Sequence, residues 1–266
     1  MGMIEHHMSV FIHLIADYGE SDPAFSEVVH RLTYEDRNVE VQTTEVPPFS
    51  TVATGFWIEQ LAVHNPAFDD LCVYSNTAPR TEATTPERAD RGGQLCYLEL
   101  DTGVPVVAVD AGYNLSFVKD RIREFRAVDL PSETGQFRSR DSFPQRVVEI
   151  ANGDTSSLGD ARATADIPST PEQTVCHVDG YGNIKTSMRA STFDPGCETV
   201  TVTINAEPRE AAVREGVSDV AEGTLALIPG SAGGSDPYEE LFFRGGSAAA
   251  AFDEPRPGDS IDIQPL

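Results

Sequence analysis

Apolar residues follow two different spacings along this chain, and the change between them constrains the fold more than any other feature. In the first part, β-branched apolar runs alternate with stretches of helical spacing. The strand-like runs are 9–17, 39–45, 71–76, 94–100 and 104–110, and the helix-like stretches are 25–35, 54–64 and 146–153. Strands that alternate with helices of this length indicate a layered α/β domain. We therefore predict that residues 1–155 form an α/β domain with a mostly parallel sheet.

The composition changes after residue 152. Residues 156–173 are rich in Ser, Thr, Asp, Ala and Pro and lack apolar periodicity, so we expect a linker there. The remaining chain has short strand-like runs separated by turns, at 174–179, 183–188, 199–204, 224–229, 239–244 and 259–264. That spacing favours a small antiparallel barrel or sandwich. We predict an all-β barrel domain over residues 174–266.

The charge of the chain is strongly negative. Lys and Arg together number 19 against 43 Asp and Glu, which gives a net charge of −24, and Lys119 and Lys185 are the only lysines. Such a balance suggests adaptation to molar salt, where the Debye length falls to about 3 Å and screens the repulsion. An acidic mesophilic protein is the alternative. Nucleic-acid binding is disfavoured in either case, because neutralising phosphates requires a basic face.

The cysteines are scattered through the chain without a C-x-x-C pair. Cys72, Cys96, Cys176 and Cys197 therefore predict a reduced, cytoplasmic protein with buried thiols. No apolar run approaches the roughly 20 residues of a membrane span, and the first residues lack the pattern of a secretory signal. No cysteine–histidine spacing typical of zinc occurs, so we expect no metal site.

Polar residues at strand ends and turns mark the candidate sites. Asp17 and Gly19 follow the first strand-like run, where a carboxylate suits acceptance from two ribose hydroxyls. The structural alternative is a helix cap, which Asp22 before Pro23 also provides. Four further stretches have similar polar turns, and each has a structural alternative as a turn, an ion pair, a cap or a hairpin; they are 72–80, 109–114, 137–144 and 177–184.

Several common motifs are absent from the sequence. It has no G-x-x-x-x-G-K phosphate loop, no G-x-G-x-x-G after the first strand-like run and no G-x-S-x-G nucleophile elbow. These absences argue against the commonest nucleotide-binding and hydrolase folds. The residues alone indicate a two-domain protein with a possible nucleoside site.

Taken in order, the polar stretches resemble the motifs of the S-adenosylmethionine hydroxide adenosyltransferases, whose relatives include the fluorinase and chlorinase. DYGESDP resembles the family's D-F-G-x-x-D-P, VDAG its P-D-N-G, FRSRD its F-x-G-R-D, and VDGYGN its V-D-x-F-G-N. VPPF and the terminal FFRGGSAAAAF followed by PGDSIDI are also similar to family segments. The likeness extends from about residue 9 to 265.

The resemblance implies a fold, an assembly and a substrate. The fold would be an α/β domain followed by a β-barrel, and the assembly a homotrimer with the site between one subunit's first domain and a neighbour's barrel. S-adenosylmethionine would be the substrate, without a cofactor.

The resemblance also assigns substrate contacts. Asp17 would accept both ribose hydroxyls, and Phe49 would pack beside the sugar. Asp179 would take the methionine ammonium. The remaining assignments are Ser231 or Ser235 for the carboxylate, and Tyr181, Asn183, Arg244 and Gly246 around the adenine.

The sequence departs from the family where hydrolytic members activate water with an Asp–Arg–His set. Asn76 occupies the Asp position, and Arg138, which is no base near pH 7, occupies the His position. The Arg partner would lie near Arg80 or Ala83. Ser139 stands where the fluorinase has a serine that can hold a halide.

Three hypotheses follow from these departures. The first is an S-adenosylmethionine hydrolase that forms adenosine and methionine, with Asn76, Arg138 and Ser139 at the nucleophile position. The second is a transferase that uses chloride or another anion. The third is a binder of S-adenosylmethionine or adenosine that has lost the chemistry.

Overall fold

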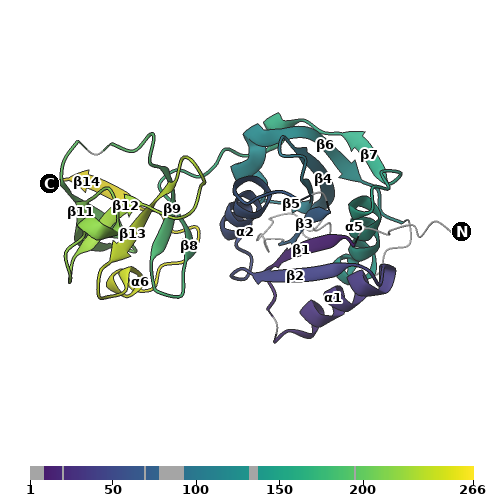
Figure 1. Ribbon diagram of the computed structural model, residues 1–266, viewed down its shortest axis with the longest axis horizontal. Helices are drawn as coiled ribbons and strands as arrows, with labels where there is room; N and C mark the ends of the chain where they lie inside the picture. The colour runs from purple at the N-terminus through teal and green to yellow at the C-terminus, as the bar shows by residue number, and fades with distance from the viewer. Residues whose placement is uncertain (1–8, 20, 69, 78–92, 132–136, 195) are drawn as a thin grey trace, which may run out of the picture. The chain divides into compact units, whose positions relative to one another are not determined.

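A computed structural model describes residues 9–19, 21–68, 70–77, 93–131, 137–194 and 196–266 (Figure 1). The chain divides into two compact units, Met1–Ser169 and Thr170–Leu266. Each unit contains one seven-stranded sheet among these residues.

The sheet of the first unit is mixed. Its strands, in the order β2-β1-β3-β5-β4-β6-β7, are β1 (Phe11–Ala16), β2 (Glu40–Glu45), β3 (Leu71–Asn76), β4 (Gln94–Leu100), β5 (Pro105–Asp110), β6 (Ile122–Val128) and β7 (Leu158–Ala161). The β2, β1, β3 and β5 strands pair in parallel. The β4 strand is antiparallel to β5 and β6, and β7 is antiparallel to β6.

The prediction of a mostly parallel sheet is therefore not confirmed. The reason lies in the short connection between β4 and β5, residues 101–104, in which Gly103 adopts a φ of 82°. A parallel pair needs a crossover of a dozen or more residues, so a connection this short permits only an antiparallel hairpin. Both 94–100 and 104–110 were correctly expected to be strands. The short distance between them in the sequence also determines that they run in opposite directions.

Helices cover both faces of this sheet. On one face, α1 (Pro23–Glu35) and α5 (Phe143–Ala151) bury apolar side chains such as Leu32 and Val147 against β1 and β3. On the other face, α2 (Thr51–Glu59), the π-helical turn η1 (Gln60–His64) and the 3-10 helix η2 (Ser116–Arg121) pack against β3, β4 and β5. A layered α/β unit, as the alternating spacing predicts, is confirmed.

The segment 156–173, expected as a linker, is partly ordered within the first unit. It contains the edge strand β7 and the short 3-10 helix η3 (Thr164–Asp166). The Arg126 side chain reaches across from β6 and donates to the carbonyl of Gly159 on β7 at 2.9 Å. A strand of four residues is too short to produce a recognisable alternation, which explains why composition alone suggested a linker.

The second unit is an all-β fold with one short helix. Its strands, in the order β14-β10-β11-β12-β13-β9-β8, are β8 (Val175–Val178), β9 (Ile184–Arg189), β10 (Thr199–Ile204), β11 (Glu207–Val213), β12 (Leu225–Pro229), β13 (Tyr238–Phe243) and β14 (Asp262–Pro265). All neighbours are antiparallel except β11 and β12. The short helix α6 (Ala248–Ala251) packs its alanines into the same core as Ile184 and Leu241.

The two edges of this second sheet approach each other. The backbone N–H of Val175, the first residue of β8, donates to the backbone carbonyl of Asp259 at 2.9 Å. The backbone N–H of Ile261, just before β14, donates to the backbone carbonyl of Gln173 at 2.7 Å. These bonds join segments at opposite ends of the strand order, so the sheet curves into a half-barrel. The expected β-rich second domain is confirmed in this form.

The cysteines and the helices of the described residues are consistent with what the sequence predicts. All four cysteines are free, and Cys72, Cys96 and Cys176 are buried. Within the described residues, no helix combines the length and apolarity that crossing a bilayer requires.

Candidate functional site

The carboxyl ends of three parallel strands in the first unit gather one set of predicted site residues. Ala16, the last residue of β1, pairs in register with Glu45 of β2 and with Asn76 of β3. Ligands in α/β sheets usually bind beyond the carboxyl ends of such strands. Asp17 and Tyr18 follow β1 directly and therefore lie at this edge.

Asp17 is bonded to the segment that follows β2. Its Oδ2 atom accepts the backbone N–H of Phe49 at 2.9 Å, across 32 residues of sequence. Phe49 has a φ of 64°, in the left-handed region that bulky residues rarely adopt, and its side chain is 45% exposed. The structure thus brings together the two residues that the resemblance places around the ribose.

The alternative structural role for this carboxylate belongs to a different residue. Asp22 caps α1, because its side chain accepts the N–H of Ala24 at 2.8 Å and Pro23 occupies the first helical turn. Asp17 is therefore not needed as a helix cap, and its position requires another explanation.

Glu45 is a second carboxylate at this edge, and sequence reasoning missed it. A Cβ atom on Gly19 would overlap the Glu45 carboxylate, so the chain after Asp17 passes directly over the end of β2. This close approach explains the glycine at position 19. The only sequence signal for Glu45 was its place as the last residue of a strand-like run.

Asn76, which the resemblance places at the position of the water-activating acid, is the last residue of β3. It is 7% exposed, and its Nδ2 donates to the Tyr18 hydroxyl at 2.8 Å. Burial raises the pKa of Tyr18, the Asn76 bond lowers it in part, and the charges of Asp17 and Asp22 raise it further. Tyr18 is consequently a neutral phenol at physiological pH and not a general base. Arg80 and Ala83 lie outside the described residues.

Arg138 and Ser139 lie on the single-turn helix α4 (Arg138–Asp141). The Arg138 guanidinium lies over the ring of Phe143, 5.7 Å from its centroid, and Phe143 belongs to the core against which Tyr18 packs. Phe137 and Ser142 hold the N-cap positions of α4 and α5, so Ser139 caps neither helix.

The neighbouring arginine has a structural role. Arg140 pairs with Asp141 at 2.7 Å and with Glu27 of α1 at 3.2 Å, which fastens α4 to α1. The alternative reading of Arg140 and Asp141 as an ion pair is confirmed.

In the second unit, Asp179 organises the turn between β8 and β9. Its Oδ1 accepts the backbone N–H groups of Tyr181 and Asn183 at 2.9 and 3.0 Å, and its Oδ2 accepts from the Asn183 side chain at 3.0 Å. Burial opposes ionisation, but the bonds from Asn183 and Tyr181 and the charge of Lys185 together lower the pKa of Asp179. The carboxylate is therefore an anion held in one orientation.

The same turn contacts the segment before α6. The Gly182 carbonyl accepts the N–H of Ala249 at 2.8 Å, and a Cβ on Gly182, whose φ is 80°, would overlap the Ser247 hydroxyl. Two segments far apart in sequence, 179–183 and 244–249, thus form one surface. Of the residues expected around the adenine, Tyr181 is 85% exposed.

The other expected adenine residues belong to the same two segments. Arg244 and Gly246 are exposed, and Asn183 is half-buried. The Arg244 guanidinium donates to the carbonyl of Val220 at 2.7 Å, which ties it to the loop before β12.

The two serines expected near the methionine carboxylate differ in their surroundings. Ser231 accepts a hydrogen bond from Lys185 Nζ at 3.2 Å, and Lys185 also contacts Glu240 at 2.6 Å and Asp179 at 3.9 Å. Ser235 is exposed beyond this cluster. Lys185 and Glu240 were not predicted as site residues, although Lys185 is one of only two lysines in the chain.

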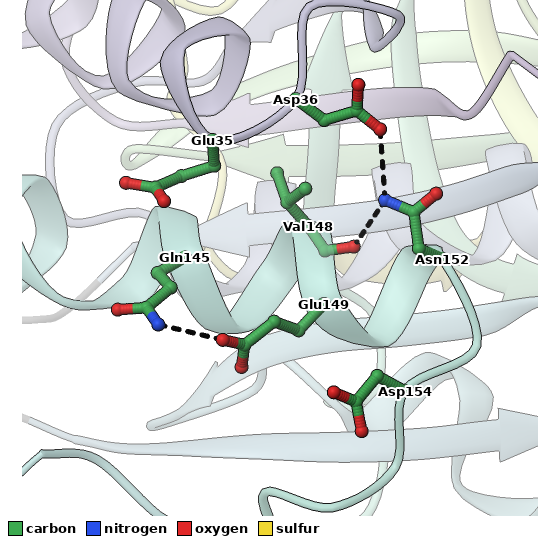
Figure 2. A pocket seen from close by; sticks show the side chains of 7 residues that line it. All are labelled: Glu35, Asp36, Gln145, Val148, Glu149, Asn152 and Asp154. Carbon is green, nitrogen blue, oxygen red and sulfur yellow. Dashed lines mark hydrogen bonds between the residues drawn. The ribbon is translucent and has the colours of Figure 1, made fainter.

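A surface depression of about 510 Å³ lies elsewhere on the first unit, at the ends of α1 and α5. Figure 2 shows Asn152 bonded to Asp36 and Val148, and Gln145 bonded to Glu149. Asp36 follows α1 and precedes β2, so the depression is at the amino ends of the parallel strands. The depression is not lined by Asp17 or by the other residues at the carboxyl ends of the parallel strands. Its carboxylates suit no part of the predicted reaction.

Residues 173–261 match the model of the SAM hydroxide adenosyltransferase C-terminal domain. This range contains Asp179, the turn to Asn183, the Lys185 cluster and the Gly246 segment. The match supports the use of S-adenosylmethionine in adenosyl transfer as the general activity.

Two solved structures share the fold over nearly the whole chain. An uncharacterized conserved protein from Thermotoga maritima is similar with a TM-score of 0.73 and 19% identity, covering 95% of this chain and 99% of the other. A conserved hypothetical protein from Thermus thermophilus has a TM-score of 0.64 and 16% identity, covering 96% and 99%. No curated protein matches the sequence. Over residues 173–261, the second unit is therefore similar to the C-terminal domain of the S-adenosylmethionine hydroxide adenosyltransferases.

Proposed function

We propose that this protein hydrolyses S-adenosylmethionine to adenosine and methionine. The observation that carries the proposal is the contact between Asp17 and Phe49 at the carboxyl edge of the parallel strands. It joins an acidic group suited to ribose hydroxyls with an aromatic ring suited to the sugar face. The family match of the second unit supplies the independent support.

Asp17 is suited to recognise the ribose because a carboxylate offers about four lone-pair positions. The bond from Phe49 N–H uses one of them and fixes the orientation of the carboxylate. A hydrogen bond from a hydroxyl to a charged carboxylate oxygen is stronger than one to a neutral oxygen. The proposal therefore assigns the ribose to Asp17 and the methionine end to the turn around Asp179.

The reaction needs little acid–base chemistry from the protein. The sulfonium leaves as neutral methionine when water forms a bond to C5′ and the C5′–S bond breaks, and the water proton passes to solvent. Positioning the two reactants can contribute roughly 7–11 kcal/mol towards lowering the barrier. The neutral state of Tyr18 and the amide of Asn76 agree with such a mechanism, because neither group needs to act as a base.

A second candidate is the transfer of adenosyl to chloride or another anion. Arg138 and Ser139 favour it, because a residue with a permanent positive charge and a residue with a hydroxyl follow one another on α4. Loss of the reaction with retention of binding is the third possibility, and Asn76 in place of an acid favours it.

Product analysis separates these candidates. The protein is incubated with S-adenosylmethionine in potassium chloride and in a halide-free salt, at molar concentration because the chain carries a net charge of −24. Adenosine in both salts supports hydrolysis, and 5′-chloro-5′-deoxyadenosine formed only in chloride supports the second candidate. Binding without any product supports the third.

An Asp36→Asn variant is the matched control. It removes one carboxylate from the first unit, at the amino ends of the parallel strands. The products formed by this variant are therefore expected to equal those of the unmodified protein. An Asp17→Asn variant is expected to lose product formation.

A further inference from the structure

Lys185 occupies a charged cluster on the surface of the second unit. Its side chain is 13% exposed, and its Nζ atom donates to Glu240 Oε2 at 2.6 Å and to Ser231 Oγ at 3.2 Å. Asp179 Oδ2 lies 3.9 Å from the same nitrogen, which is a charge contact longer than a hydrogen bond. The cluster thus joins the turn after β8, the start of β9, the loop after β12 and the middle of β13.

The direction of the bond between Lys185 and Ser231 determines what the serine can recognise. An ammonium group has three donors and no acceptor, so the Ser231 oxygen must accept from Lys185. The serine's own O–H hydrogen then points away from Lys185 and donates to another group. Ser231 is exposed, so that group can belong to a ligand.

Glu240 holds the Lys185 side chain in place. It is 7% exposed, and the 2.6 Å contact is a charge-assisted bond in partly desolvated surroundings. Their charges offset each other, and Asp179 remains as an anion. The cluster therefore presents a hydroxyl donor at Ser231 and a charged acceptor at Asp179, a few ångströms either side of one ammonium.

An amino-acid end group has the matching chemistry, with a carboxylate that accepts and an ammonium that donates. We propose that Lys185 is a specificity-determining positioning residue, which orients Ser231 as a donor so that the protein selects ligands with an α-carboxylate. This inference rests on the proposed use of S-adenosylmethionine and extends it to discrimination against its decarboxylated form. A lysine suits the place because its ammonium is compact, whereas arginine presents a broad planar fork.

The test compares two ligands that differ only in the carboxylate: S-adenosylmethionine and decarboxylated S-adenosylmethionine. Apparent dissociation constants are measured by calorimetry at low temperature, and chromatography of the same samples measures how much ligand was converted during the titration. We expect the unmodified protein to prefer S-adenosylmethionine by about 10-fold or more. Lys185→Met is expected to reduce that preference to within about 2-fold, mainly by weakening S-adenosylmethionine.

Two further variants exclude indirect effects. Arg209→Met removes one positive charge from the same unit, at a side chain that is 41% exposed and paired with Glu207, and is expected to keep the preference. Ser231→Ala is expected to lose it, and the double variant Lys185→Met/Ser231→Ala to lose no more than Lys185→Met alone.

Several outcomes overturn the inference. If Lys185→Met weakens the binding of both ligands equally, the lysine has only a structural role. If Lys185→Met leaves both dissociation constants unchanged, Ser231 does not depend on Lys185. Failure of the proposed function is distinguishable, because the unmodified protein would then form no adenosine from S-adenosylmethionine although it still binds it. Binding of neither ligand would overturn both the proposed function and the inference.

Discussion

Asp17 Oδ2 accepts the backbone N–H of Phe49 at 2.9 Å, and this bond links the end of β1 to the segment after β2. Phe49 adopts a left-handed backbone conformation at φ 64°, which is costly for a residue with a large side chain. The bond to Asp17 helps to hold that conformation. The aromatic ring and the carboxylate are therefore positioned by one local arrangement.

Replacing Asp17 tests this arrangement. We expect Asp17→Ala to weaken the binding of adenosine by about 10-fold or more, roughly 1.4 kcal/mol, because a charge-assisted bond is lost. Calorimetric titration with adenosine measures the effect. Asp36→Asn, at the amino ends of the strands, serves as the control. Unchanged affinity in Asp17→Ala would disprove the ribose assignment.

The hydrogen bond between Asn76 and Tyr18 is expected to stabilise the carboxyl ends of strands β1 and β3. Asn76→Ala leaves the half-buried Tyr18 hydroxyl without this donor and should lower the free energy of unfolding by about 1–3 kcal/mol. Tyr18→Phe removes the other partner. Chemical denaturation of both single variants and the double variant measures the coupling, and strictly additive losses would show that the bond contributes nothing.

Glu239 makes the stability of the second unit depend on pH. It is 5% exposed, and burial raises its pKa from 4.5 to about 7. The fold thus favours the neutral acid. The stabilisation is fully present below pH 4.5 and is lost as the pH rises through 7.

Glu239→Gln removes this titration. Relative to the unmodified protein, we expect the variant to gain roughly 1–3 kcal/mol of stability between pH 4.5 and pH 8. Denaturation midpoints at both pH values provide the measurement. Glu207→Gln, an exposed position on β11, is the control. Parallel pH profiles of the unmodified protein and Glu239→Gln would contradict the raised pKa.

The oligomeric state implied by the family resemblance is a prediction of its own. A homotrimer would have a mass of about 86 kDa, three times the 28.8 kDa of the chain. Light scattering after size-exclusion chromatography in molar salt measures it. A mass of one or two chains would refute the trimer.

Much of the fold could be predicted from the sequence, because many strands consist of apolar or β-branched runs. The strands β3 and β4 have the bounds expected from 71–76 and 94–100. The strands β6 and β11 were missed, because Arg123, Glu124 and Pro208 interrupt their patterns. Charged side chains on the solvent face of a strand hide its alternation, and pairing with neighbours then decides the structure.

The candidate site was predictable only in part. The Asp17 and Asp179 positions followed from motifs, whereas Lys185 and Glu240 depend on pairing between β9 and β13, which local sequence does not encode. The structural interpretation of Asp179 is confirmed, and its proposed role in ligand binding is compatible with it. Asp179 organises a turn through three hydrogen bonds, and the same bonds hold it as an anion.

The most direct test of the central claim is the identity of the product formed from S-adenosylmethionine in a halide-free salt. Chromatography with mass detection is applied to the unmodified protein and to Asp17→Asn. The account predicts adenosine and methionine in equal amounts from the unmodified protein, and none from the variant. Intact S-adenosylmethionine after prolonged incubation, or equal adenosine from both proteins, would contradict it.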